Sequence, residues 1–166
     1  FKAHEIANLH PNAETSHKRK ADWVSGEEYL LLMPPKLADA HLAGDLHIHD
    51  LEYFGTRPFC QDWDLRYFFY YGLMPDGMGT RTSVAGPAKH PEVAILHTAK
   101  ILASAQTNFA GGEGFYNFLV FLAPFMRGIG YDRIKQLMQM MFFEYTQAYV
   151  ARGGQLVFSN IQVQPG

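Results

Sequence analysis

Two histidines and the only cysteine of the chain lie within a stretch of fourteen residues and are the side chains best able to do chemistry. His47 and His49 are two positions apart, so on a strand both imidazoles would point to one face and could bind a substrate or a metal together. No Cys-x-x-Cys or His-Glu-x-x-His pattern occurs in the sequence, which argues against a metal site. A substrate site and a structural role, with both rings bonded to buried backbone, remain as alternatives.

Cys60 is a lone thiol whose reactivity depends on its surroundings. Apolar residues recur after it at helical spacing as far as Gly72, so Asp62 is predicted to cap a helix. A thiol just ahead of a helix N-terminus meets the helix dipole and free amide groups, which favour the reactive thiolate. The alternative is an inert cysteine buried among its aromatic neighbours.

The same residues carry a family resemblance. The run His47-Ile48-His49-Asp50-Leu51, the pair Tyr53-Phe54 and the run Arg57-Pro58-Phe59-Cys60 resemble the active-site region of the anaerobic (class III) ribonucleoside-triphosphate reductases, most closely the archaeal-type members. The resemblance extends from about Ala13 to the C-terminus. Later elements that share it are Gln106 before Gly111-Gly112, Leu122-Ala123-Pro124-Phe125, and Gly153-Gly154-Gln155 through Ser159-Asn160.

The resemblance implies a fold and a reaction. The fold would be α/β, with this chain as the mostly helical N-terminal part of a ten-stranded α/β barrel of the pyruvate formate-lyase and ribonucleotide reductase kind, in a homodimer. We therefore expect the chain to be a fragment. Such enzymes reduce ribonucleoside triphosphates to deoxyribonucleotides through a glycyl radical, which an activating enzyme with an iron–sulfur cluster and S-adenosylmethionine generates.

The resemblance also suggests roles for individual residues. Cys60 matches the thiol that helps the ribose 2′ hydroxyl leave as water, and His47, His49 and Phe59 would contact the substrate. Gln106 would contact a dNTP or ATP effector at a dimer interface. The radical cysteine, the glycyl radical segment, a zinc site and an ATP-binding regulatory domain are all expected outside this chain, which alone should not turn over substrate.

Composition narrows the remaining possibilities. With 166 residues and 48% apolar content the chain can bury a core, and we expect a single segment of one domain. The net charge of −2, with both signs spread along the chain, favours neither nucleic acid nor a membrane surface as a partner. No apolar run is long enough to span a bilayer. A single cysteine fits a reducing, cytoplasmic location.

The elements that must position these residues can be predicted by range. Residues 1–44 form a helical lead-in, with a solvated helix or arm to about residue 24 and short helices over 27–33 and 36–42. The active-site region spans 45–72, and a loop spans 76–91. Helices are predicted over 91–109, 115–127 and 131–152, with a turn at 110–114, a stop at Gly153-Gly154 and a strand over 155–163. The 115–127 helix is apolar nearly all round, so we expect it to be buried.

One face of the predicted 91–109 helix consists of small and branched residues, with one amide among them. The face comprises Ile95, Ala99, Leu102, Ala103 and Gln106. We expect it to meet its symmetry mate in the dimer, which makes 91–152 the dimer and effector region. Gln106 could read an effector base or be a core amide satisfied by backbone. Two other functions stay open: a non-catalytic nucleotide-binding or regulatory helical module derived from the family, and a redox or metal-binding protein using His47, His49 and Cys60.

Overall fold

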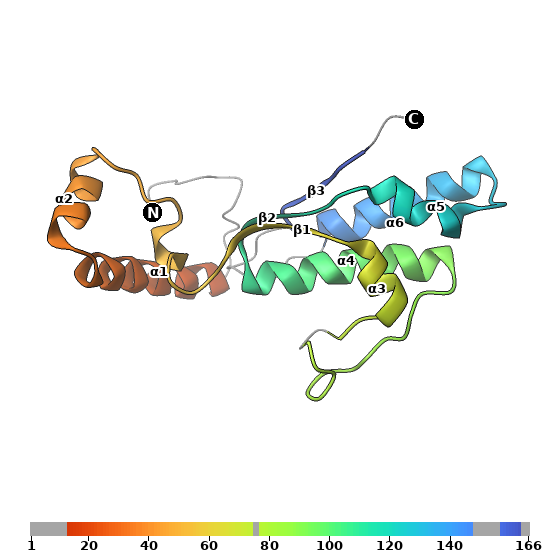
Figure 1. The fold of residues 1–166 in the computed structure, drawn as a ribbon, viewed down its shortest axis with the longest axis horizontal. Helices are drawn as coiled ribbons and strands as arrows, with labels where there is room; N and C mark the ends of the chain where they lie inside the picture. Colours follow the sequence, from red (N-terminus) through yellow and green to blue (C-terminus); the bar gives the residue numbers. More distant parts are fainter. Residues whose placement is uncertain (1–12, 75–76, 148–156, 164–166) are drawn as a thin grey trace.

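The centre of the fold is a three-stranded parallel sheet in the order β1-β2-β3 (Figure 1). The computed structural model describes residues 13–74, 77–147 and 157–163. The strands are β1 (Phe59–Trp63), β2 (Ala110–Phe115) and β3 (Ser159–Ile161). Parallel neighbours need long crossovers, and here each crossover carries two helices. The predicted α/β class is therefore confirmed, with helices in the majority.

The N-terminal helices differ in part from the prediction. Helix α1 (Ala13–Leu32) is one continuous helix of 20 residues, so the separate helix expected over 27–33 is wrong. Gly26 lies inside α1 without breaking it, since a single glycine costs a helix only about 1 kcal/mol. Helix α2 (Pro35–Ala43) begins at a proline and ends at Gly44 in the left-handed conformation, as predicted for the second helix. The first twelve residues lie outside the described part of the chain.

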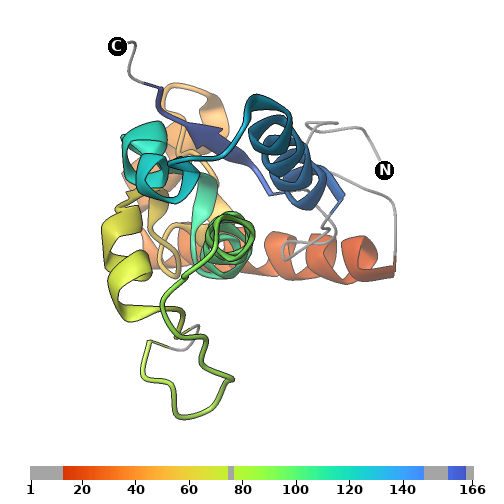
Figure 2. The same cartoon turned by 90° about the vertical axis from the view of Figure 1, so that its right-hand side faces the viewer.

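Short elements connect α2 to the long helices. A 3-10 turn, η2 (Leu51–Tyr53), packs against α1 and precedes β1, and α3 (Leu65–Tyr71) follows β1. The expected loop after α3 is confirmed for its described residues, 77–90, which contain neither helix nor strand. The views in Figures 1 and 2 both show this loop projecting away from the sheet and from the long helices.

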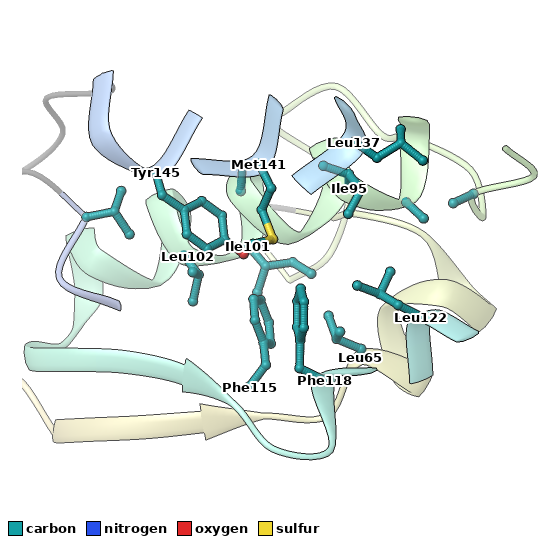
Figure 3. Close-up of a cluster of buried hydrophobic side chains, with 14 residues drawn as sticks. Leu65, Ile95, Ile101, Leu102, Phe115, Phe118, Leu122, Leu137, Met141 and Tyr145 are labelled. Atoms are coloured by element: carbon teal, nitrogen blue, oxygen red, sulfur yellow. The ribbon is translucent and has the colours of Figure 1, made fainter. Parts of the chain in front are cut away.

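The core lies between one face of the sheet and the pair of helices α4 (Pro91–Asn108) and α6 (Tyr131–Gln147) (Figure 3). Phe115 ends β2, and Phe118 begins α5 (Phe118–Met126); both rings are completely buried. Helix α6 contributes its buried stripe of Leu137, Met141 and Tyr145. The predicted helices over 91–109 and 131–147 are confirmed, and residues 148–152 lie outside the described part.

The face of α4 that was expected to meet a symmetry mate is buried inside this chain instead. Ile95 and Leu102 are completely buried, Ala99 is 4% exposed, and all three belong to the core that α6 shares. The dimer contact predicted for Ala99 is therefore wrong, because a small side chain that permits close helix packing serves a partner from the same chain equally well.

Two further predictions fail around β2. Residues 110–114 form a strand and not the predicted turn, because pairing with β1 and β3 overrides the low strand propensity of glycine. Helix α5 starts three residues later than predicted. It is not buried all round either, since Leu119 and Val120 are 44% and 54% exposed.

The predicted C-terminal strand is confirmed over Ser159–Ile161, and the stop predicted at Gly153-Gly154 lies outside the described residues. No helix in the described part of the chain has the length and apolar character needed to cross a membrane.

Candidate active site

Cys60 is the second residue of β1 and lies at an irregularity in the pairing of this strand with β2. Its φ is +42°, in the left-handed region, and the register shifts between Phe59 and Gln61. The thiol is free and exposed, and its Sγ lies directly over Gly111, where an added Cβ would be only 2.6 Å from the sulfur. The helix predicted after Cys60 is confirmed as α3, which ends at Gly72, but its predicted cap is wrong: the strand continues to Trp63, and Asp64 in place of Asp62 caps α3. A helix dipole therefore does not explain the reactivity expected of this thiol.

The two histidines precede β1 but do not lie on a strand. Residues 45–50 form turns and irregular backbone, so the predicted strand is wrong. The rings instead form a run of neighbours, with centroids 5.9 Å apart for His41 and His47, 6.0 Å for His47 and His49, and 6.3 Å for His49 and Phe59. This run connects the histidine segment to Phe59, the residue before Cys60.

The histidine segment is fixed by a third histidine that the sequence did not single out. The backbone N–H of Ile48 donates to Nδ1 of His41, at 3.2 Å, which fastens the segment to α2. In the described residues no group of three or more histidine, cysteine, aspartate or glutamate side chains is arranged to hold a metal ion.

Gln106 is completely buried and has partners on two other segments. Its Nε2 donates to the carbonyl of Gly111 at 3.1 Å, and its Oε1 accepts from the backbone N–H of Phe158 at 3.1 Å. The amide therefore ties α4 to β2 and to the residues before β3. This is the geometry of the core alternative, and it does not support an effector contact for Gln106.

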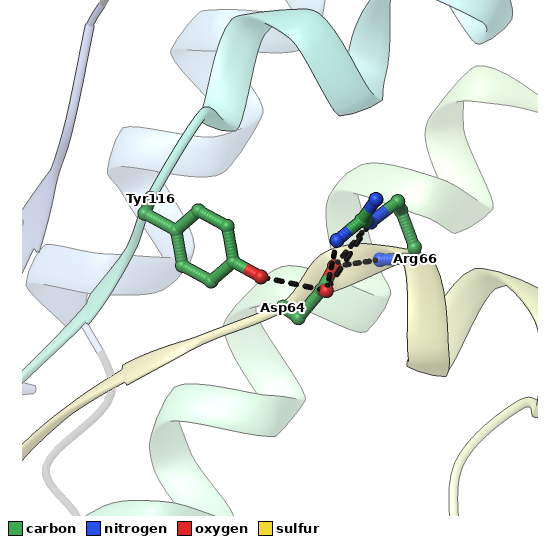
Figure 4. A network of polar contacts seen from close by, with 3 residues as sticks. All are labelled: Asp64, Arg66 and Tyr116. Atoms are coloured by element: carbon green, nitrogen blue, oxygen red, sulfur yellow. Dashed lines mark hydrogen bonds and ion pairs between the residues drawn. The ribbon is translucent and has the colours of Figure 1, made fainter.

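A polar network that the sequence did not reveal joins β1, α3 and the end of β2 (Figure 4). Asp64 caps α3 by accepting from the backbone N–H of Arg66, pairs with the guanidinium of Arg66 at 2.7 Å, and accepts from the Tyr116 hydroxyl at 2.6 Å. The bonds from Arg66, followed by that from Tyr116, hold the pKa of Asp64 below its ordinary value. The alternation of Asp62 and Asp64 was the available signal for a strand at this position.

A second feature missed from sequence is a buried carboxyl group on the core face of β2. Glu113 is completely buried, and its Oε2 accepts from the indole N–H of Trp63 at 2.7 Å. Its other oxygen has no hydrogen-bond partner among the described residues. Burial raises the pKa of Glu113, and the bond from Trp63 only partly opposes this.

Two cavities flank Trp63. One, of about 240 Å³, lies between Trp63 and α4 and is mostly apolar. The other, of about 480 Å³, lies along the edge of β1 and includes Asp62, Asp64 and Tyr116 in its lining. The larger volume is in the range of small-molecule sites.

Comparisons with known proteins agree with the resemblance noted in the sequence. The family model described as "Anaerobic ribonucleoside-triphosphate reductase" matches residues 5–166. The anaerobic ribonucleoside-triphosphate reductases of Escherichia coli (strain K12) and Salmonella typhimurium (strain LT2) are each 30% identical over 95 residues, which are 57% of this chain and 13% of theirs.

Solved structures show the same fold. The anaerobic ribonucleotide reductase from Thermotoga maritima with MES in the active site matches with a TM-score of 0.69 and 21% identity, over 90% of this chain and 28% of that chain. Its complex with dATP and CTP matches with a TM-score of 0.65 and 22% identity, over 89% and 26%. This chain thus spans between an eighth and three tenths of the length of these relatives. Because the family model covers nearly the whole of it, the chain belongs to the anaerobic ribonucleoside-triphosphate reductase family.

Proposed function

We propose that this chain is the part of an anaerobic ribonucleotide reductase that presents one active-site thiol to the substrate. The observation that supports the proposal is a free, exposed Cys60 on a parallel strand, in a chain that belongs to this family. Phe59 precedes this thiol and has the ring of His49 next to it, with His47 next to His49. The whole protein would convert ribonucleoside triphosphates to deoxyribonucleotides for DNA replication. The archaeal-type subgroup remains a prediction.

Cys60 would act on the ribose 2′ hydroxyl. Its thiol donates a proton to that oxygen, which then leaves as water, and an exposed sulfur over Gly111 has the access this step needs. Abstraction of the ribose 3′ hydrogen requires a thiyl radical on a cysteine outside this chain. The glycyl radical that supplies it, formed by an iron–sulfur and S-adenosylmethionine activating enzyme, also lies outside, as does the expected zinc site.

His47 and His49 are proposed to contact the nucleotide, with Phe59 packing against it. Both histidine side chains are exposed, and imidazoles can donate hydrogen bonds to phosphate or sugar oxygens. The contact of His49 with Phe59, the residue before Cys60, and of His47 with His49 supports this role.

The partners of the whole protein are proposed on the same basis. We expect a cytoplasmic homodimer that binds dNTP or ATP effectors and docks the activating enzyme. One of the similar Thermotoga maritima structures has dATP bound in its specificity site. A non-catalytic nucleotide-binding module is the alternative, but no feature of the described residues favours it over a reductase.

The decisive test is Cys60→Ala in the full-length, radical-loaded enzyme. We expect dNTP formation to be lost while the radical signal and the melting temperature stay near those of the wild type, because the side chain is exposed. Cys60→Ser should not restore activity, since a hydroxyl is a far weaker acid than a thiol. Near-normal dNTP formation in Cys60→Ala would show that the catalytic assignment is wrong.

A further inference from the structure

On the face of the sheet opposite the core, the middle strand β2 presents glycines. Pairing aligns Asp62 on β1, Gly114 on β2 and Asn160 on β3 in a single row across the sheet. Glu113 and Phe115 point into the core, so the alternation of a strand turns Gly112 and Gly114 to the opposite face. On this face, which we call the open face, the side chains of Asp62, Phe158 and Asn160 are exposed, and the exposed Cys60 lies two residues before Asp62.

Two polar side chains converge over Gly114. A Cβ added at Gly114 would lie 2.1 Å from Oδ1 of Asn160 and 2.3 Å from Oδ1 of Asp62. The two oxygens are therefore no more than about 4.4 Å apart, the sum of those distances. Any side chain at position 114 would displace both, so glycine in the middle strand is what lets these groups approach each other.

The chemistry of this pair selects a particular kind of ligand. A carboxylate only accepts hydrogen bonds, and an amide accepts at one atom and donates at the other. Two acceptors this close together suit two adjacent hydroxyl donors. They do not suit a phosphate, because a carboxylate would repel it. Among the described residues, Asp62 also belongs to no group of three or more histidine, cysteine, aspartate or glutamate side chains that could hold a metal ion.

The position of the pair indicates which hydroxyls these are. Asp62 follows Cys60 by two residues on the same strand, so the two residues are no more than about 7 Å apart along it, roughly the span of one sugar ring with its hydroxyls. Across β2, the Phe158 ring packs over Gly112, 3.1 Å from an added Cβ, and offers an apolar wall. Asp62 also lines the 480 Å³ cavity at the edge of β1.

We propose that Asp62 and Asn160 bind the 2′,3′-diol of the ribonucleotide on the open face beside Cys60, and thereby determine specificity for the ribose. This inference rests on the proposed function and extends it to two residues on different strands. Asp62 holds one hydroxyl through a charge-assisted bond, and the Asn160 amide holds its neighbour.

The test compares a ribonucleoside triphosphate with its 2′,3′-dideoxy analogue in the full-length enzyme. The KM of the first and the competitive inhibition constant of the second are measured for wild type, Asp62→Asn and Asn160→Ala. We expect each variant to bind the ribonucleotide about fivefold to tenfold more weakly and the dideoxy analogue as well as the wild type does. Where turnover is lost, equilibrium titration with the same two nucleotides gives the same comparison.

Matched controls separate recognition from folding. Asp39→Asn on α2 and Asn108→Ala at the end of α4 make the same chemical changes at exposed positions away from the open face and should change neither constant. Gly114→Ala should weaken ribonucleotide binding as the loss of both Asp62 and Asn160 would, because its methyl group displaces both side chains.

The possible outcomes are distinct. Equal weakening of both nucleotides, or of neither, in an enzyme whose wild type reduces ribonucleotides would overturn the diol assignment and leave the reductase assignment intact. Failure of the radical-loaded wild type to reduce any ribonucleotide would overturn the proposed function itself, and the inference with it.

Discussion

At the scale of single residues, ionisable side chains are exposed to solvent on the open face of the sheet and buried on its core face. Asp62 lies exposed on the open face, where substrate and solvent can reach it. Glu113, on the other face, has one oxygen bonded to Trp63, and its other oxygen is buried without a hydrogen-bond partner among the residues that the structure describes. A carboxyl group in that position favours its neutral form, because burial penalises the charge.

Glu113 should make the stability of the protein depend on pH. Its folded-state pKa is raised above the ordinary value of 4.5, so its contribution to stability is fully present below pH 4.5 and is lost as the pH rises through the folded-state pKa. Glu113→Gln keeps the shape of the side chain and the acceptor for Trp63, but glutamine cannot ionise. The variant should therefore not lose this contribution to stability as the pH rises.

Melting temperatures of wild type and Glu113→Gln between about pH 4 and pH 8 check this prediction. The two curves should lie close together at the acid end, and the variant should become the more stable protein as the pH rises. A constant difference at every pH would show that Glu113 does not titrate over this range. Glu14, an exposed carboxylate in the first turn of α1, provides the control as Glu14→Gln.

At the scale of elements, the turn from β1 into α3 depends on one carboxylate. Asp64 ends the strand region, caps the helix and receives the Tyr116 hydroxyl from the residue that follows β2. It therefore fixes the helix start and joins the two strands at the same point. The same turn brings the aromatic residues of α3 beside Trp63, which forms a wall of both cavities.

Asp64→Ala should destabilise the protein by about 1 to 2 kcal/mol, through loss of the helix cap and of the bond from Tyr116. Asp64→Asn should lose less, because asparagine is an equally good cap. Urea unfolding of the two variants measures both changes. Equal losses would mean that the ion pair with the largely exposed Arg66 matters more than the cap, against the usual small value of such pairs.

At the scale of the whole molecule, the sheet and its helices are assembled from segments far apart in the sequence. The β1 and β3 strands are nearly a hundred residues apart, and β2 joins them. Gln106 contributes to this assembly because its amide bonds β2 on one side and the backbone of Phe158 on the other. Asp62 and Asn160 can share a face only when the three strands are in register.

Gln106→Ala should therefore act through stability. Leaving the Gly111 carbonyl and the Phe158 N–H without their partner should cost about 1 to 3 kcal/mol. Calorimetric titration of the folded variant with dATP should give an effector affinity close to that of the wild type. Weaker effector binding by a variant of normal stability would instead restore the effector role that the sequence suggested for this residue. Thr107→Ala, one residue later and exposed, is the matched control.

The sequence by itself determined three of the helices and some of the chemistry-bearing residues. Helices α2, α4 and α6 were predictable because proline starts, glycine stops and apolar periodicity are local signals. The family, and the interest of Cys60, His47 and His49, followed from motifs that are contiguous along the chain. The β3 strand and the α/β class were likewise predicted from the sequence.

Only the tertiary structure decided the sheet and the site it builds. Residues 110–114 consist of three glycines, one glutamate and one alanine, so no local signal predicts a strand there. Pairing with β1 and β3 on both sides makes them a strand. The Asp62 cap, the histidine strand and the dimer role of Ala99 all failed for the same reason, since each depended on which distant segment lies alongside. Strand pairing and helix packing are long-range interactions, and they override local preferences whenever they bury more apolar surface or satisfy more backbone groups.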